Sequence, residues 1–306
     1  MPLDLRPASA GDRSAIAALV RASELEVIGR VTADWDEITV FLWATPGFEP
    51  SLDAVVAEVD GSAVAFAGVF PHDESEDEPD GSMVVVDHRR RVVDPELEAT
   101  LVEWVERRAL ERGATAVRQF VPRQDERRRE LLATRGFAAV RATFTMHRDL
   151  PDQSDATPPD RITVTTLAEH PDLRGLHAAA QESFAEHFGF VPEPFERWRA
   201  SRMPVDTYDP AQWWLALDGD EIVGYLLQVT GGVVAQVGEL GVRPAWRGRG
   251  IGTALLRRSF ADIARRGARE VTLWVDAENG TGAVRVYERV GMTPVVVTDT
   301  FDKELR

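Results

Sequence analysis

The chain has 306 residues with 35 basic and 51 acidic side chains, a formal charge of −16, no cysteine and one lysine, Lys303. These counts exclude disulfides, a thiolate nucleophile and cysteine-ligated zinc, and in practice a P-loop lysine or a Schiff-base lysine in a core pocket. The length favours two domains of about 150 residues each. We expect a cytoplasmic protein, since the sequence has no apolar run long enough to span a bilayer and no signal-peptide pattern.

A proline-rich acidic segment from Asp149 to Asp160 divides the sequence nearly in half. It reads D-L-P-D-Q-S-D-A-T-P-P-D, and a stretch of this kind cannot supply a core element. Residues 1–160 carry a charge of 18 − 31 = −13, and the remainder carries 17 − 20 = −3. We therefore predict one domain at 1–150 and a second at 161–306, joined by a linker at 151–160.

The two halves share short motifs in the same order. V-D-G at Val59–Gly61 corresponds to L-D-G at Leu217–Gly219, each between strand-like runs as in a hairpin. R-G-A at Arg112 recurs at Arg266, an offset of 266 − 112 = 154. Chance matching of short motifs is the alternative, but the constant order and offset favour an internal duplication of about 150 residues.

Hydrophobic patterning predicts a mixed order of elements in the second half. Apolar residues recur at helical spacing at Leu256, Phe260 and Ile263, whereas the strands are rich in β-branched and aromatic residues. The expected strands are 161–167, 213–217, 222–229, 233–242, 270–275 and 293–298, and the expected helices are 171–188, 251–266 and 281–290. This order indicates an α/β (α+β) fold in each of two tandem domains, with helices flanking a mixed, mostly antiparallel sheet.

A glycine-rich turn between a predicted strand and helix carries the strongest functional signal. The turn runs from Arg247 to Thr253 and reads R-G-R-G-I-G-T. Glycines let successive backbone N–H groups approach one anion, and the free N–H groups at a helix start face the same point. From Arg243 to Arg269 there are eight arginines and one acid, which favours an anionic ligand over the alternative of a flexible surface turn.

Two common nucleotide motifs do not fit this turn. A Rossmann site needs G-x-G-x-x-G early in a βαβ unit and an acid about 20 residues later, and a P-loop needs its lysine. The turn instead resembles the acetyl-CoA pyrophosphate motif of the GNAT superfamily of N-acetyltransferases, with Arg247, Gly250 and Gly252 at the matching positions. The stretch from Asn279 to Met292 resembles the last conserved block of that family, and V-G-E-L-G-V at Val237–Val242 resembles its fourth strand.

The resemblance implies acetyl-CoA as co-substrate and assigns its contacts. The pyrophosphate is expected on the turn and the pantetheine on the strand before it. The implied CoA contacts are Leu240, Gly241, Val242, Arg247, Gly248, Arg249, Gly250, Ile251, Gly252, Thr253, Asn279 and Tyr287. Tyr287 is also implied to protonate the leaving thiolate; a core aromatic is the alternative reading of that residue.

Three further residues are candidates for work on the acceptor. Glu239 is a carboxylate among apolar strand residues and is suited to take a proton from an amine; a strand residue that faces solvent is the alternative. Asp276 and Glu278 are reserve candidates for the base, or ordinary loop acids. His187 and Asp276 are the residues expected to line the acceptor pocket, although a lone histidine more often has a structural role.

The first half lacks the features of the second. At an offset of 154, the three turn glycines fall on Asp94, Glu96 and Glu98, and Glu239 falls on Val85. Carboxylates would repel a pyrophosphate, and they suit the start of a helix behind a proline. We therefore expect 1–150 to be a degenerate copy without a CoA site. The acidic run 73–80 is expected to be a solvated loop.

Taken together, the residues and the resemblance predict an acetyl-CoA-dependent N-acetyltransferase that acetylates a primary amine of a small molecule. Direct attack in a ternary complex is expected, because a chain without cysteine cannot form a cysteinyl acetyl-enzyme. The alternatives are acetylation of a cysteinyl-sugar amine, given a distant similarity to mycothiol synthase, and a non-catalytic protein that binds acyl-CoA or a partner. We expect no metal, nucleic acid or membrane, and a monomer or homodimer.

Overall fold

The protein is described here from a computed structural model. The residues that it describes are 4–45, 47–71, 82–89, 95–150, 157–187, 190–203, 209–230, 234–280 and 282–305. The expected acidic loop 73–80 and most of the expected linker, residues 151–156, lie outside the described residues. The chain forms two compact units: unit 1 comprises Met1–Thr143 and Val296–Arg306, and unit 2 comprises Phe144–Val295.

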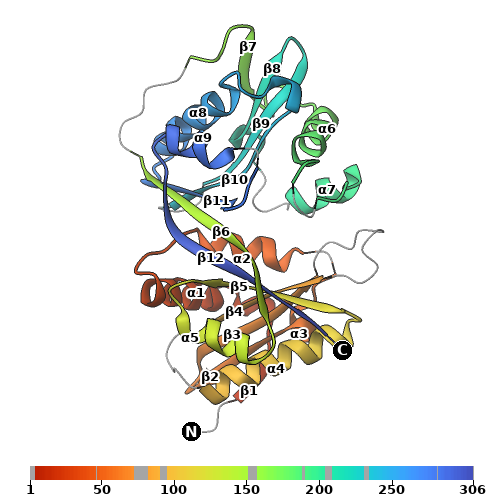
Figure 1. Cartoon of the computed structure of the whole chain (residues 1–306), viewed down its shortest axis with the longest axis vertical. Helices are drawn as coiled ribbons and strands as arrows, with labels where there is room; N and C mark the ends of the chain where they lie inside the picture. Colours follow the sequence, from red (N-terminus) through yellow and green to blue (C-terminus); the bar gives the residue numbers. More distant parts are fainter. Residues whose placement is uncertain are drawn as a thin grey trace. The chain divides into compact units, whose positions relative to one another are not determined.

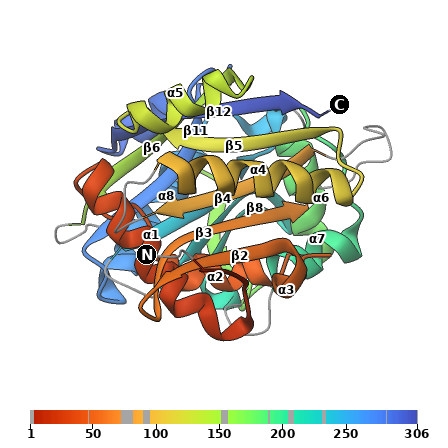
Figure 2. The same cartoon turned by 90° about the horizontal axis from the view of Figure 1, so that it is seen from below.

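The sheet of unit 1 is built mainly from the first half of the chain (Figures 1 and 2). Its strands have the order β1-β2-β3-β4-β5-β12, and only β4 and β5 among the pairs within the first half are parallel. The strands are β1 Asp4–Pro7, β2 Ala54–Val59, β3 Ser62–Pro71, β4 Ser82–Arg89, β5 Ala116–Pro122 and β12 Thr293–Glu304. The helices are α1 Arg13–Val27, α2 Trp35–Trp43, α3 Pro50–Asp53, α4 Pro95–Glu111 and α5 Glu126–Thr134.

Helices cover both faces of this sheet. Alternate residues of a strand point to opposite faces. On one face Ala65 and Val69 pack with Leu101 of α4, and Figure 2 shows α4 lying along β3, β4 and β5. On the other face Phe66 packs with Ile16 of α1.

The sheet of unit 2 has the order β6-β11-β10-β9-β8-β7, in which β10 and β11 are parallel and the pairs among β7, β8, β9 and β10 are antiparallel. Its strands are β6 Ala138–Asp149, β7 Ile162–Thr166, β8 Trp213–Asp218, β9 Glu221–Val229, β10 Val234–Val242 and β11 Glu270–Asp276. Its helices are α6 Leu173–Phe184, α7 Phe195–Arg202, α8 Ile251–Arg265 and α9 Ala283–Arg289. The predicted fold class is confirmed, and most predicted elements agree within a few residues. The last strand, however, ends at Glu304 and not at 298, and α7 is an additional helix.

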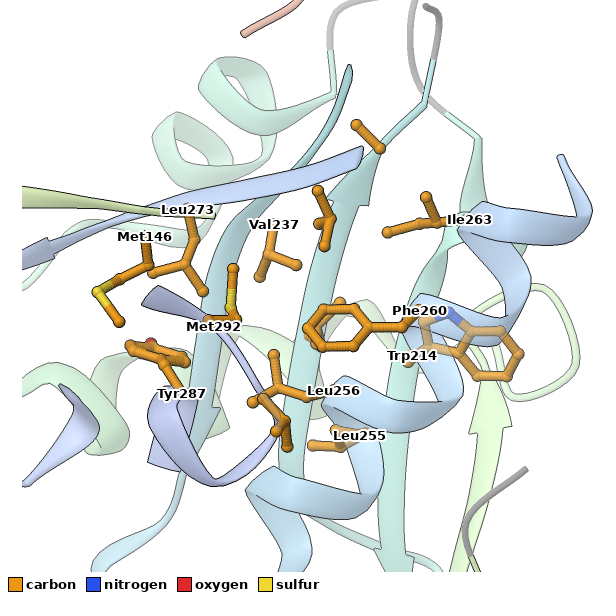
Figure 3. Packing of buried hydrophobic residues seen from close by; sticks show 14 of the residues in the cluster. Met146, Trp214, Val237, Leu255, Leu256, Phe260, Ile263, Leu273, Tyr287 and Met292 are labelled. Carbon is orange, nitrogen blue, oxygen red and sulfur yellow. The ribbon is translucent and has the colours of Figure 1, made fainter. Parts of the chain in front are cut away.

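The core of unit 2 also lies on both faces of its sheet. Trp214 and Leu226 pack with Phe260 of α8, and Figure 3 shows Phe260 in this cluster. Their strand neighbours Leu215 and Tyr225 belong to a second cluster on the opposite face, with α6 and α7. The cavity of this unit is lined by residues of α8 and α9 and by the end of α6.

The predicted hairpins are confirmed in both units. Between β2 and β3, Asp60 and Gly61 have φ of 50° and 71°, as a type I′ turn requires. Between β8 and β9, Gly219 has φ of 64°. In unit 1 the strands β1 to β4 are antiparallel and β4 pairs in parallel with β5. In unit 2 the strands β7 to β10 are antiparallel and β10 pairs in parallel with β11, which agrees with a duplicated arrangement.

The units do not have the boundaries at 150 and 161 that we expected. β6 begins in unit 1 and ends in unit 2, whereas β12 (Thr293–Glu304) begins in unit 2 and ends in unit 1. The reason is long-range pairing: β12 is antiparallel to β5 from Thr298↔Pro122 to Glu304↔Ala116. Two hydrogen bonds of 2.8 Å from Arg118 to Asp302 reinforce this pairing.

Candidate functional site

A cavity in unit 2 opens where β10 and β11 separate. The two strands pair only from Val234↔Glu270 to Gln236↔Thr272. One residue further, the register between β10 and β9 shifts between Val237 and Glu239, which marks a bulge. Beyond this point both strands line a cavity of about 320 Å³, a volume within the range of small-molecule sites.

The glycine turn borders this cavity and exposes backbone donors to it. Gly248 and Gly250 have φ of 76° and 84°, a region that favours glycine. Among the described residues, no acceptor is found for the six N–H groups from Gly248 to Thr253, and Ala254 is the first to bond back, to Gly250 O at 3.0 Å. The turn and the first turn of α8 therefore form a concave set of donors suited to an anion.

The two arginines of the turn both donate hydrogen bonds to other parts of the protein. Arg247 donates to Val242 O at 3.1 Å and to Ser183 O at 2.9 Å, and it pairs with Glu186. Its guanidinium thus fastens the turn to β10 and α6. Arg249 donates to a nearby backbone carbonyl at 2.9 Å and does not border the cavity. Arg247 still borders the cavity, and the backbone N–H groups of the turn add donors for which no acceptor is found among the described residues.

Tyr287 borders the cavity from the α8/α9 side. It lies on α9 and is 7% exposed, in a cluster that includes Met146, Leu273 and Met292 (Figure 3). Burial raises the pKa of its hydroxyl to about 12. The phenol is therefore neutral, with its proton in place, throughout the physiological pH range.

Glu239 lies at the bulge of β10 and is held by two donors. Arg202 Nε donates to Glu239 Oε1 at 2.6 Å, and the Tyr225 hydroxyl donates to Oε2 at 3.0 Å. Arg202 also donates to Glu193 at 2.9 Å. A carboxylate has about four lone-pair positions, so each oxygen of Glu239 keeps one for a further donor. The side chain is 21% exposed and borders the cavity.

Arg202 and Tyr225 are site residues that the sequence analysis missed. Burial lowers the pKa of Arg202, but the charges of Glu239 and Glu193 outweigh it and the net pKa is raised. Burial, and then the charge of Glu239, raises the pKa of Tyr225 well above its usual value. Both side chains therefore stay protonated and can donate. Tyr225 also explains Gly241: a Cβ there would lie 2.3 Å from the tyrosine ring.

The remaining predicted residues are brought to the same cavity. His187, Asp276 and Asn279 border it, whereas Glu278 does not and instead bonds through its N–H to Asp276 at 2.9 Å. Burial, followed by the charge of Arg247, lowers the pKa of His187 against the opposing effect of Asp276. The predicted CoA contacts at the cavity are Leu240, Gly241, Val242, Arg247, Gly248, Gly250, Ile251, Gly252, Thr253, Asn279 and Tyr287. Residues found there without prediction include Ser183, Phe184, Trp274 and Arg289.

Known proteins share this fold. Residues 173–292 match the model of the acetyltransferase (GNAT) family. A solved GCN5-related N-acetyltransferase from Sphaerobacter thermophilus is 31% identical, with a TM-score of 0.80 over 99% of this chain and 96% of that one. A tandem GNAT protein from the clavulanic acid biosynthesis pathway superimposes with a TM-score of 0.74 at 16% identity, over 100% and 99% of the two chains, so it shares the tandem fold.

A curated relative gives a narrower match. The mycothiol acetyltransferase of Streptomyces scabiei is 34% identical over 171 residues, which are 53% of this chain and 54% of that protein. The alignment thus spans about half of either protein. With the whole-length match to the Sphaerobacter protein, these likenesses show that the chain belongs to the GNAT family of acetyltransferases. No helix among the described residues has the length and apolar character needed to cross a membrane.

Proposed function

We propose that this protein transfers the acetyl group of acetyl-CoA to a primary amine of a small molecule, at one site in unit 2. The observation that carries the proposal is the joint presence, around one cavity, of an anion cradle, a protonated phenol and a fixed carboxylate. A pyrophosphate on the donors of Gly248 to Thr253 would direct the pantetheine into the opening between β10 and β11. The thioester would then lie near the bulge and Tyr287.

In the proposed reaction the amine nitrogen attacks the thioester carbonyl directly. The C–N bond forms as a tetrahedral intermediate, whose oxyanion accepts a hydrogen bond from a backbone N–H freed by the bulge of β10. Glu239 takes the amine proton, directly or through one water. The C–S bond then breaks, and Tyr287 gives its proton to the thiolate, which leaves free CoA and the N-acetylated amine. Arg202 and Tyr225 hold Glu239 in position.

Unit 1 takes no part in this proposed chemistry. Its helix α4 begins at Pro95 and carries Glu96 and Glu98 in its first turn, where α8 has a glycine start without acids. Carboxylates at this position would repel the phosphates of CoA. Calorimetry with acetyl-CoA is expected to give one binding site per chain, and two sites would overturn this part of the proposal.

Acetylation of a cysteinyl-sugar amine is the second candidate. The likeness to the Streptomyces protein favours it. A purified chain that acetylates a cysteinyl-glucosamine conjugate at least about tenfold faster than simple alkylamines would support this narrower function. Equal rates for both would support the general one.

Thiol release from acetyl-CoA with a panel of primary amines tests the activity itself. Turnover with any amine, lost when Glu239 and Tyr287 are both replaced, is the expected result. Acetyl-CoA binding without turnover by any amine would favour the third candidate, a non-catalytic acyl-CoA-binding protein.

A further inference from the structure

A histidine and two carboxylates lie together where β6 ends and β11 begins, and we call them the β6–β11 cluster. His147 Nε2 lies 2.9 Å from Glu270 Oε2 and 3.7 Å from Asp149 Oδ1. One side-chain nitrogen or oxygen of each residue lies within 4.8 Å of those of the other two. None of the three residues borders the cavity, so the cluster is separate from the site of the proposed function.

Strand pairing and alternation bring the three side chains of the cluster to one face of the sheet. β6 and β11 are neighbouring strands, and Leu150 N donates to Arg269 O at 2.8 Å beside the cluster. Met146, Leu150 and Val271 pack in the core with α8. Each residue of the cluster is next to one of these three in sequence, and side chains alternate along a strand. The cluster therefore points away from α8, toward the opposite face of the sheet.

The charge of the cluster favours a cation. Two carboxylates face one imidazole, and the arginines next to them in sequence, Arg148 and Arg269, alternate to the other face. Arg148 indeed lies over the ring of Phe260 on α8, with its guanidinium carbon 5.2 Å from the ring centroid. His147 is 8% exposed, which fixes the imidazole, whereas the Asp149 side chain is 86% exposed. A cation can thus reach a buried nitrogen and two carboxylates from solvent.

We propose that the β6–β11 cluster binds a divalent metal ion of the zinc type, with His147 Nε2 and the carboxylates of Asp149 and Glu270 as its three protein ligands. Zn²⁺ binds such atoms at about 2.0–2.2 Å, usually in a tetrahedron, whose ligand atoms are then roughly 3.3 Å apart. The two separations from Nε2, 2.9 and 3.7 Å, lie on either side of this value. The ion takes the place of the direct contact between His147 and Glu270, and water completes the fourth position.

The imidazole selects the class of ion, and the position of the cluster defines its role. Mg²⁺ and Ca²⁺ prefer oxygen ligands, whereas imidazole suits zinc and the neighbouring transition metals. An ion at this place cross-links the end of β6 to the start of β11 and stabilises the folded chain by binding to it. The sequence analysis did not expect a metal: His147 and Glu270 are 123 residues apart, so no ligand spacing marks the cluster.

Calorimetry on the full-length protein, freed of metal with a chelator that is then removed, tests the proposal with Zn²⁺ as the probe. We expect zinc affinity to fall by at least about tenfold in His147→Gln and in Glu270→Gln. Asp149→Asn should weaken binding by less, because that side chain is 86% exposed. No zinc binding to the wild type, or unchanged binding in both His147→Gln and Glu270→Gln, would overturn the proposal. Mg²⁺ should bind at least about tenfold more weakly than Zn²⁺, and equal binding would overturn the class of ion.

His170→Gln is the matched control. His170 lies in the turn that follows β7, outside the cluster, and it also has acids nearby in sequence, Glu169 and Asp172. This variant should bind zinc like the wild type. An equal loss of affinity in His170→Gln and His147→Gln would overturn the proposal, because zinc would then bind histidines of the chain without regard to the cluster.

Thermal unfolding separates metal binding from a structural role of the histidine. Zn²⁺ should raise the Tm of the wild type and of His170→Gln and leave the Tm of His147→Gln unchanged. A hydrogen bond between His147 and Glu270 without metal binding predicts a lower Tm for His147→Gln and no effect of zinc on any of these proteins, and that result would overturn the proposal. These measurements use neither acetyl-CoA nor an amine, so their outcome is independent of the proposed function.

Discussion

Helix α4 follows β4 and helix α8 follows β10, each after the strand that pairs in parallel with the next one, and the two helices begin in opposite ways. α8 begins after two glycines of positive φ, with N–H groups free to receive an anion. α4 begins at Pro95 with Glu96 and Glu98 in its first turn, and Glu98 is 7% exposed. Acidic side chains near the N-terminus of a helix stabilise the helix, because they interact favourably with the positive end of its dipole. In unit 1 the chain's own carboxylates therefore supply the negative charge that a bound phosphate would supply in unit 2.

Gly250→Glu should have the largest effect, because it gives α8 the kind of start that α4 has. The glutamate must adopt a backbone φ of 84°, at a cost of about 1–2 kcal/mol. In addition, its carboxylate repels the pyrophosphate. We expect acetyl-CoA affinity to fall by at least about a hundredfold in calorimetry. Gly136→Glu is the control, since Gly136 of unit 1 has the same φ of 84°; a similar loss of affinity in the control would contradict the phosphate assignment.

Tyr287→Phe should come next. We expect kcat to fall about a hundredfold with little change in CoA affinity, because the change removes a proton donor and leaves the packing. The pH profile sharpens the test: with the hydroxyl pKa raised to about 12, the phenol keeps its proton below that value. Wild-type activity should therefore show no alkaline loss from Tyr287 between pH 7 and about pH 10. Full activity of the variant would make Tyr287 a packing residue.

Arg202→Met should reduce kcat/KM by about tenfold, because Glu239 and Glu193 lose the cation between them. The pair is partly exposed, which limits the effect. Arg202→Lys should restore part of this activity, because it returns a cation to the same place.

Arg199→Met is the matched control on the same helix, because Arg199 pairs with an exposed glutamate, Glu196, at 3.1 Å. It should leave kcat/KM unchanged. An unchanged kcat/KM in Arg202→Met would contradict a role of Arg202 in positioning Glu239.

Glu37→Gln in unit 1 should have the smallest effect and leave CoA binding unchanged. Burial, and then the charge of Asp34, raises the pKa of Glu37 from 4.5 to about 7. Because the pKa of Glu37 is higher in the folded than in the unfolded chain, its contribution to the free energy of unfolding is fully present below pH 4.5. This contribution is lost as the pH rises through 7, where the buried carboxyl must take up charge. After allowance for partial exposure, the variant should be about 1 kcal/mol more stable at pH 8 and not at pH 4.

Urea unfolding at the two pH values measures this effect, with Glu130→Gln on the exposed face of α5 as the control. A variant that is no more stable than wild type at pH 8 would contradict the assignment. A change in CoA affinity would break the contrast between the units.

Local patterns made much of this fold predictable. The hairpin at Asp60 and Gly61 and the start of α8 at Gly250 depend on residues that are adjacent in the sequence, and both are found as predicted. α7 was missed because F-E-R-W-R-A-S-R has little apolar periodicity. Among its described side chains Trp198 alone is buried, and Phe195 packs partly buried against the same cluster.

The site was less predictable, because its geometry depends on distant pairs. Arg202 and Glu239 are 37 residues apart in sequence, and no spacing rule relates them. Arg247 is predicted to contact CoA from its place beside the glycines, and it borders the cavity. Its contacts with Ser183 and Glu186, which are 64 and 61 residues away in sequence, could not be predicted from that place.

β12 has a consequence for any attempt to divide this protein. Its residues from Val296 onward belong to unit 1, where they cover the edge of β5. A cut within residues 151–156 would leave the first fragment with β5 uncovered and the second with a strand that lacks its partner. Unpaired edges of this kind are templates for wrong association. The repeat in the sequence divides the chain at its middle, whereas the folded unit 1 also needs the residues from Val296 onward.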